Sequence, residues 1–283
     1  KDFEIATNKK VRDSFNSEDK KYLFKWSKQA IKNGNGPLGE VFKEREPWSS
    51  TEQIGNAIVF SFAGHDTTAH TLSWLVYELA KNRVYQDRLR QEVKVFWDKY
   101  DLDNNIIEME NLKELKFMTL CITEILRMWP ANSNGTFREF VEDDYIHDEN
   151  GDQINLPKGT FFQIVNWARH RSEKLWGKDS NVFNPDRDFK DSEIWENQGY
   201  AFTNPYSDRY SPFTYPPRDC IGKNFSQLEM RIMLLHIFRE LKFETKYITM
   251  EGLNNATMGP RDPQDENTIG MPIIVKLIGN SKL

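Results

Sequence analysis

Apolar residues recur at steps of three and four over residues 47–82, and this spacing predicts one long helix. Ser49 and Glu52 fit a capping box at its start. At about 1.5 Å per residue, roughly thirty residues span about 45 Å, which is enough to cross a whole domain. The middle of this helix has a low helix propensity. Gly64 destabilises a helix by about 1 kcal/mol relative to alanine, and the side chains of the Asp-Thr-Thr run at 66–68 compete for backbone hydrogen bonds. The pattern therefore predicts a notch of small and polar residues at the centre of the helix.

The same helical period recurs in other stretches of the chain. It predicts helices over residues 17–33, 82–100 and 112–130, the last of which ends at Pro130. A further helix is predicted from Phe225 onward, with one apolar face turned to the core. The positions of that face are Phe225, Leu228, Ile232, Leu235, Phe238 and Leu241.

The pattern changes to that of short strands between residues 136 and 165, where Asn150-Gly151 is the turn signal of a hairpin. A closing strand is predicted over residues 270–277. Stretches rich in glycine, asparagine, proline or acidic residues predict loops, at 34–39, 101–105 and 191–217. No internal repeat is evident. The predicted fold class is therefore mainly helical with a small β-sheet region.

Composition narrows the function classes. The 283 residues, 38% of them apolar, suffice for one large domain or two small ones. The balance of 38 basic and 43 acidic residues argues against a general nucleic-acid binder. No run of about 18 apolar residues occurs, so neither a membrane span nor a signal peptide is predicted. Only two cysteines are present, and Cys121 falls among apolar positions, which argues against a disulfide framework.

The second cysteine, Cys220, lies in the run Phe-Thr-Tyr-Pro-Pro-Arg-Asp-Cys-Ile-Gly at 213–222, just before the helix at Phe225. A helix N-terminus is expected to lower the pKa of the thiol. Gly222 can take backbone angles closed to other residues and leaves room for a flat group, and Arg218 offers a planar fork of donors to a carboxylate. The run fits a loop that presents one thiolate to a cofactor with carboxylates, such as haem. Alternatively, a lone cysteine before a helix is a small buried hydrophobe.

The notch also has two interpretations. It can face the open side of an iron, where Gly64 leaves space for dioxygen, Thr67 donates a hydrogen bond and Asp66 relays the protons that O–O cleavage needs. It can instead mark a close helix crossing in which hydroxyls bond to the preceding turn. A third candidate, Glu124 with Arg127, shares one helix face, but an i,i+3 ion pair contributes only about 0.2–0.5 kcal/mol and usually belongs to a solvated face.

Taken together, five motifs in sequence order resemble the C-terminal part of a cytochrome P-450, the haem-thiolate monooxygenase family. They span roughly residues 50–245 and are Ala63-Gly64-x-Asp66-Thr67-Thr68, Glu124-x-x-Arg127, Pro157-Lys158-Gly159-Thr160, Pro185-Asp186-Arg187 and Phe213 to Gly222. The resemblance implies a cytochrome P-450 fold, with residues 1–283 forming the C-terminal haem-binding part of a single domain whose N-terminal part is absent.

The resemblance also implies roles for individual residues. Cys220 would be the axial ligand of the haem iron, and Asp66 and Thr67 the catalytic pair for oxygen activation. Further cofactor-binding residues would be Arg218 and Arg138 at the propionates, with Phe213, Gly222, Ala63 and Gly64. Glu124, Arg127 and Arg187 would form a buried charge cluster, in which loss of one member costs about 3–5 kcal/mol. His170 and Arg171 match a recurrent pair with a structural role.

One departure from the family pattern concerns the ligand loop. Pro216 stands where the family usually has glycine, and Pro216-Pro217 removes two backbone donors and fixes two φ angles. The shape of the loop and the redox tuning of the thiolate are therefore in question. Asp219, directly before the ligand, adds a negative charge that is expected to make ferric iron harder to reduce.

The function implied is insertion of one oxygen atom of dioxygen into a small lipophilic substrate. The cofactor would be haem b, with electrons from NADPH through a flavoprotein reductase or from a ferredoxin-type donor, and basic residues near the cysteine, Arg218, Lys223 and Arg231, would meet that partner. One alternative is a haem-thiolate isomerase or dehydratase, against which the presence of Asp66 and Thr67 argues. Another is a non-catalytic truncated remnant.

The chain begins at Lys1 without an initiator methionine, which suggests truncation. The absent N-terminal part would carry any membrane anchor, and with an anchor the expected location is the cytosolic face of the endoplasmic reticulum membrane. Phe62, His65 and residues 131–135 are expected to line part of the substrate pocket. His65 would either join the proton path or fill a packing gap.

Overall fold

The computed structural model describes residues 50–189, 207–215, 218–254 and 257–278. The helix predicted at 17–33, the loop at 34–39, the capping residue Ser49 and Pro216 lie outside the described residues. The chain divides into two compact units, residues 1–66 and 67–283, which are described separately.

The predicted long helix is present as α5, Ser50–Lys81, and it runs through the notch without a break. Of the first unit, the structure describes the N-terminal half of α5, up to Asp66, in which Ala57 is buried. The second unit begins at Thr67. Here Thr71 Oγ1 donates to the Thr67 carbonyl at 2.9 Å and Ser73 Oγ to the Ala69 carbonyl at 2.8 Å, so these hydroxyls are satisfied within the helix itself.

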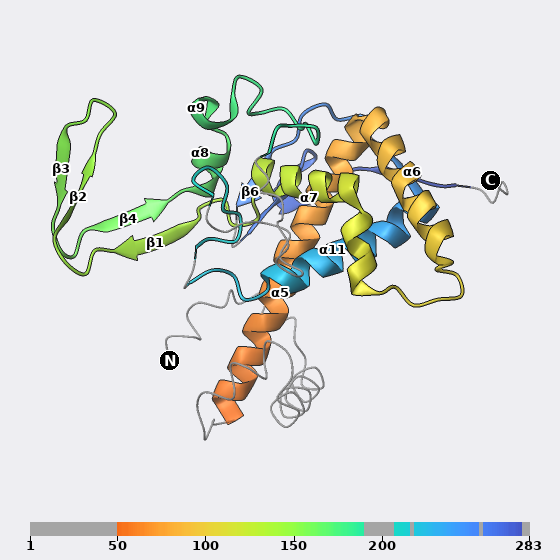
Figure 1. The fold of residues 1–283 in the computed structure, drawn as a ribbon, viewed down its shortest axis with the longest axis horizontal. Coiled ribbons are helices and arrows are strands. Elements are labelled where there is room, and N and C mark those ends of the chain that lie inside the picture. Colours follow the sequence, from red (N-terminus) through yellow and green to blue (C-terminus); the bar gives the residue numbers. More distant parts are fainter. Residues whose placement is uncertain (1–49, 190–206, 216–217, 255–256, 279–283) are drawn as a thin grey trace. The chain divides into compact units, whose positions relative to one another are not determined.

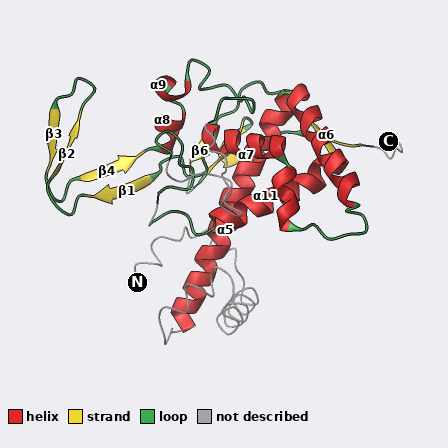
Figure 2. Ribbon diagram, viewed as in Figure 1, coloured by secondary structure: helices red, strands yellow, loops and turns green. Residues whose placement is uncertain are grey.

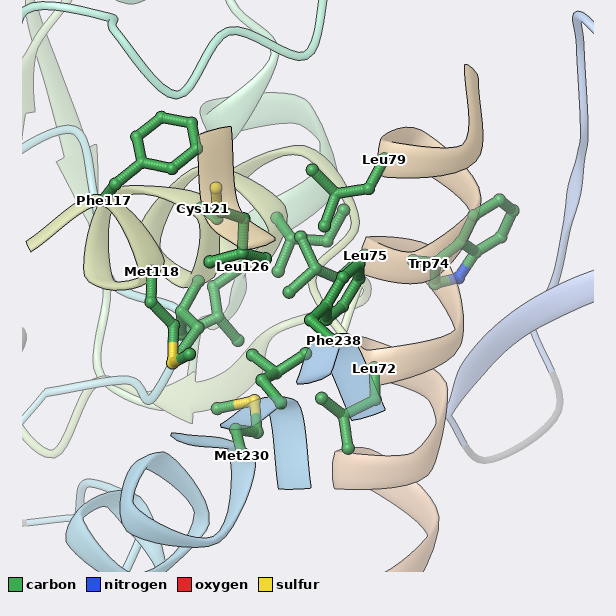
Figure 3. Packing of buried hydrophobic residues seen from close by; sticks show 14 of the residues in the cluster. Leu72, Trp74, Leu75, Leu79, Phe117, Met118, Cys121, Leu126, Met230 and Phe238 are labelled. Atoms are coloured by element: carbon green, nitrogen blue, oxygen red, sulfur yellow. The ribbon is translucent and has the colours of Figure 1, made fainter. Parts of the chain in front are cut away.

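Three further helices build the core of the second unit with the C-terminal half of α5. They are α6, Arg83–Tyr100, α7, Lys116–Met128, and α11, Lys223–Glu240. Figure 3 shows Leu72, Leu75 and Leu79 of α5 directed toward side chains of α7 and α11. Each such side chain stabilises the fold by about 1.5–3 kcal/mol when fully buried. This helical core supports the segments that carry the candidate site.

The predicted boundaries hold for α6 and shift for α7. Asn82 caps α6 by accepting the backbone N–H of Tyr85 at 3.2 Å, and the left-handed Asp101 ends the helix. The stretch predicted as one helix over 112–130 is instead a 3-10 helix, η1, Met109–Glu114, followed by α7. Glu92 of α6 sets the new start, because its carboxylate accepts the free N–H groups of Phe117 and Met118 at 2.7 and 2.8 Å.

The predicted apolar face of α11 is wrong at Phe225 and Ile232, which are exposed. The buried positions are Gln227, Met230, Arg231, Leu234, Leu235 and Phe238. Polar residues can occupy this face because they are hydrogen-bonded: Arg231 donates to the Thr119 hydroxyl at 2.9 Å and to the Gln227 carbonyl at 2.8 Å. The predicted face is confirmed at Leu235 and Phe238, and Leu228 and Leu241 pack partly buried against the core. The apolar pattern is therefore right for part of the face and misses its buried polar positions.

The strands form small antiparallel sheets, as Figures 1 and 2 show. β1, Thr136–Glu139, pairs with β4, Phe161–Ile164, and between them β2, Asp144–His147, pairs with β3, Gln153–Leu156. The hairpin turn at Asn150-Gly151 is confirmed, with Gly151 at φ 89°. Gly135 precedes β1 at φ 72°, and a Cβ there would lie 1.7 Å from the Ile164 carbonyl oxygen, so this position requires glycine.

Two short helices, α8, Asn166–His170, and α9, Glu173–Trp176, follow the hairpins. After α11, β5, Leu241–Glu244, pairs with β9, Ile274–Leu277, which confirms the predicted closing strand. A meander was not predicted, and it consists of β6, Gly252–Asn254, β7, Met258–Asp262, and β8, Asp265–Ile269. Within the described residues, no helix has the length and apolar character needed to cross a membrane.

Candidate haem-thiolate site

A short loop, residues 211–222, carries Cys220 to the start of α11. Its described part is closed by main-chain hydrogen bonds: the Thr214 N–H donates to the Ser211 carbonyl at 3.0 Å, and the Cys220 N–H donates to the Phe213 carbonyl at 2.9 Å. Thr214 has φ 65°, which is uncommon for a β-branched residue, and its hydroxyl donates to the Arg218 carbonyl at 2.9 Å. The loop therefore folds back on itself and places the cysteine two residues before the helix cap Gly222.

The two cysteines differ sharply in access. Cys121 is completely buried in α7, and burial raises the pKa of its thiol well above the ordinary value. Cys220 is an exposed residue, so of the two cysteines it is the better placed to meet a ligand. This donor chemistry fits a haem iron, which accepts a cysteine thiolate as axial ligand.

The sequence predicted that the pKa of the Cys220 thiol is lowered, and this prediction is wrong for the protein without a cofactor, in which the pKa is raised. Loss of hydration around the sulfur raises the pKa of the thiol, and the negative charge of Asp219 adds to this effect. The backbone N–H groups of Gly222 and Lys223, at the start of α11, act in the predicted direction and lower it. Because a metal-bound thiol is deprotonated outright, these N–H groups are suited to stabilise the sulfur as a bound thiolate.

Gly222 does not need the backbone freedom that the sequence suggested. Its φ of −83° is open to any residue, and a Cβ there would lie 3.8 Å from the Cys220 sulfur, which is ordinary contact. Asp219, next to the sulfur, forms an ion pair with Lys223 at 3.2 Å. Arg218 is exposed and forms no ion pair within the described part of the chain, so its guanidinium is available to a carboxylate.

The predicted charge cluster is assembled at the C-terminal end of α7. Arg127 Nε lies 2.7 Å from one Glu124 oxygen, and Arg187 Nε lies 3.3 Å from the other. Glu124 and Arg127 are both fully buried, so the solvated-face interpretation of this pair is wrong. Arg187 also pairs with Asp179 at 2.9 Å, a member of the cluster that sequence reasoning missed.

Backbone carbonyls complete the cluster. Arg127 Nη1 donates to the carbonyls of His170 and Ser180 at 2.6 and 2.7 Å, and the Glu124 carboxylate also accepts the N–H of Asn184 at 3.0 Å. Buried charges persist where hydrogen bonds and opposite charges satisfy them, and removal of one partner leaves the others uncompensated. The cluster therefore ties α7 to the end of α8 and to the segment that follows α9.

His170 and Arg171 lie at the end of α8 and have distinct contacts. His170 is fully buried, and burial together with the positive charges of Arg169 and Arg127 lowers its pKa to about 3. Arg171 donates from Nε and Nη2 to the Met128 carbonyl, at 3.1 and 2.7 Å, and its guanidinium lies 3.7 Å from the centre of the Trp167 ring. Both residues therefore hold α8 against the C-terminal end of α7.

The remaining predicted site residues lie apart along the chain. Ala63, Gly64 and Asp66 belong to the first unit, and a Cβ at Gly64 would meet no atom of the described residues within 4 Å beyond the nearby backbone of its own helix. Thr67 opens the second unit and is half-buried. Arg138 is half-buried in β1 and donates to the neighbouring Phe137 carbonyl at 2.8 Å. That these residues share one site with Cys220 remains a prediction.

Two further residues support the loop and were not identified from the sequence. Tyr210 is fully buried, and its hydroxyl donates to the Thr123 carbonyl of α7 at 3.1 Å. The N–H of the adjacent Ser211 donates to His170 Nε2 at 3.1 Å. The sequence offered one signal for Tyr210: it is an aromatic residue in the polar stretch 191–217, which was predicted to be a loop.

Comparisons with known proteins identify the family of the chain. The cytochrome P450 family model matches residues 38–260, and the chain belongs to that family. CYP13A5 of Caenorhabditis elegans is 31% identical over 225 residues, which cover 78% of this chain and 40% of the relative. Human cytochrome P450 4F8 is 36% identical over 186 residues, 65% of this chain and 32% of the relative.

A solved structure shows the same fold. The crystal structure of the cytochrome P450 CYP102L1 matches with a TM-score of 0.67 at 20% sequence identity, over 93% of this chain and 57% of that one. The predicted fold class, the C-terminal part of a cytochrome P450 fold with small sheets, is therefore confirmed. The chain spans 40% or less of the length of the two curated relatives named above.

Proposed function

We propose that this chain is the cysteine-bearing, C-terminal part of a single haem-thiolate domain, and that the domain acts as a monooxygenase on a small lipophilic substrate. The observation that carries the proposal is the position of Cys220, an exposed residue just before α11 whose sulfur is hydrogen-bonded by the N–H groups of Gly222 and Lys223. Membership of the cytochrome P450 family supports haem as the group that this sulfur would hold.

Haem b, when bound, would supply the redox and oxygen chemistry of the reaction. The loop would hold the Cys220 sulfur in place through the bond between the Cys220 N–H and the Phe213 carbonyl. Arg218, and Arg138 from β1, would each pair with a propionate, because a guanidinium suits a carboxylate. Gly222, Phe213, Ala63 and Gly64 are proposed as further contacts of the cofactor.

Asp66 and Thr67 are the proposed catalytic pair. Oxygen chemistry at iron requires protons, which a carboxyl and a hydroxyl group can pass in sequence. The presence of both residues favours a monooxygenase over an isomerase or dehydratase.

Electrons are proposed to come from NADPH through a flavoprotein reductase or from a ferredoxin-type protein. The docking prediction is wrong in one part: Arg231 is fully buried and cannot meet a partner. Lys223 is paired with Asp219, which leaves Arg218 as the exposed cation of the three. A location at the cytosolic face of the endoplasmic reticulum is likewise a proposal.

The ferrous carbon-monoxide difference spectrum tests the proposal. We expect the chain supplied with haem to give a strongly red-shifted Soret band, which Cys220→Ala loses and the matched control Cys121→Ala keeps. A band that survives Cys220→Ala, or haem binding without the red shift in the parent, would contradict thiolate ligation by Cys220. Absence of haem from the parent chain would contradict its acting as a holoenzyme by itself.

A further inference from the structure

His170 lies at the point where the charge cluster meets the cysteine loop. Its ring is fully buried and faces Tyr210, with ring centroids 5.5 Å apart and an interplanar angle of 26°. Its Nε2 accepts the N–H of Ser211 at 3.1 Å, while its own backbone carbonyl accepts Arg127 Nη1 at 2.6 Å. One residue is therefore bonded to the loop through its side chain and to the cluster through its backbone.

From Ser211 the contact continues to the cysteine through the main chain. The Ser211 carbonyl accepts the Thr214 N–H at 3.0 Å, which closes the turn that contains Phe213. The Phe213 carbonyl in turn accepts the Cys220 N–H at 2.9 Å. The position of the Cys220 backbone thus depends on a turn whose first residue is held by His170.

The bond from Ser211 needs a neutral imidazole. Nε2 can accept an N–H only when it carries no proton, so the ring proton is assigned to Nδ1. Burial and the neighbouring charges of Arg169 and Arg127 disfavour a second proton. Ser211 itself is buried, so without His170 its N–H would lose its partner in a place where water does not readily replace it.

We propose that His170 is a positioning residue that fixes the Cys220 loop by accepting the Ser211 N–H, and so transmits the rigidity of the charge cluster to the ligand sulfur. The link to haem rests on the proposed function, whereas the link to the loop rests on the structure alone. In this proposal the acceptor nitrogen of His170 matters for the loop, and the size of its ring does not. The variants test these two properties one at a time.

Two substitutions remove one property each. His170→Phe keeps an aromatic ring against Tyr210 and removes the acceptor, while His170→Gln removes the ring and can place an amide oxygen close to the Nε2 position. Tyr77→Phe is the control for stability, because it deletes a different, part-buried hydrogen bond, from the Tyr77 hydroxyl to the Ile248 carbonyl at 3.0 Å. None of these variants alters Cys220.

The first measurement is hydrogen exchange of residues 207–215 in the haem-free chain, together with the rate at which a thiol reagent modifies Cys220. We expect His170→Phe to raise both rates about tenfold, the factor that corresponds to about 1.4 kcal/mol. We expect His170→Gln to bring both rates most of the way back to those of the parent. Tyr77→Phe is expected to lower the melting temperature without changing either rate. Equal rates in His170→Phe and the parent, equal effects of Phe and Gln, or a uniform rise in exchange over the whole chain would overturn the proposal.

The second measurement is the reduced carbon-monoxide spectrum of the haem-supplied variants. His170→Phe is expected to convert part of the red-shifted band to the unshifted form, and His170→Gln to keep the parent spectrum. A full red-shifted band in His170→Phe would contradict the link to the ligand. If the parent itself lacks this band, the proposed function fails, while the exchange rates still decide whether His170 positions the loop.

Discussion

The charge cluster around Glu124 and the loop around Cys220 are held in opposite ways. In the cluster, buried side-chain charges are matched by opposite charges and backbone carbonyls. In the loop, two main-chain hydrogen bonds close the turn, the side-chain contacts are few, and Cys220 is exposed. The buried charges are thus concentrated in the cluster, whereas the proposed ligand Cys220 lies in a loop at the surface.

The largest effect is expected from breaking the cluster. Arg127→Leu strands the buried Glu124 carboxylate and is expected to cost about 3–5 kcal/mol of unfolding free energy. The matched control is Lys94→Met, which breaks an ion pair of the same 2.7 Å length whose two members are 40% and 64% exposed. That change is expected to cost no more than about 0.5 kcal/mol. Urea denaturation measures both, and similar losses in the two variants would contradict the contrast between buried and exposed pairs.

A second effect concerns the pH dependence of stability at the junction of the two regions. His170 has a pKa of about 3 when folded and an ordinary value of 6.5 when unfolded. Between pH 6.5 and pH 3, the unfolded chain binds a proton at this histidine that the folded chain does not bind. The contribution of neutral His170 to the free energy of unfolding is therefore fully present above pH 6.5, and it falls by about 1.4 kcal/mol for each pH unit below that.

His170→Gln is expected to remove this part of the slope. Denaturation midpoints of the parent and the variant at pH 7 and pH 5 measure the difference directly. The parent is expected to lose more stability than the variant between pH 7 and pH 5, because the parent alone carries the histidine. Parallel pH profiles would show that His170 is not held neutral in the folded protein.

The smallest effect is expected at the loop itself. Lys223→Met would leave the charge of Asp219 uncompensated beside the sulfur, which favours the ferric state of a bound haem. A partly exposed pair contributes about 0.2–1 kcal/mol, so the reduction potential is expected to fall by about 10–40 mV. Asp219→Asn is expected to raise it. Spectroelectrochemical titration measures both, and a rise in Lys223→Met would contradict the assignment.

The sequence predicted the helices well wherever apolar periodicity and burial coincide, as in α5 and α6. It also predicted α11 but gave its buried face only in part, because Arg231 and Gln227 occupy buried positions that a hydrophobic pattern assigns to solvent. The β6–β8 meander was missed because Met258–Asp262 shows no strand alternation; its position depends on tertiary contacts such as the bond from Trp74 Nε1 to the Met258 carbonyl.

The candidate site was predictable in part. The spacing of Glu124 and Arg127 identified an ion pair, but its burial depends on carbonyls at His170 and Ser180, which no local pattern relates to α7. The cysteine loop was evident from its motif, whereas its tether to His170 joins residues 41 positions apart. Contacts of this kind follow from the fold and not from local sequence.

Iron X-ray absorption of the haem-supplied chain tests most directly the central claim, that the loop presents Cys220 as the ligand of iron. The account predicts a sulfur neighbour of the iron in the parent and in Cys121→Ala, and its loss in Cys220→Ala. A sulfur neighbour that persists in Cys220→Ala, or is absent from the haem-loaded parent, would contradict it.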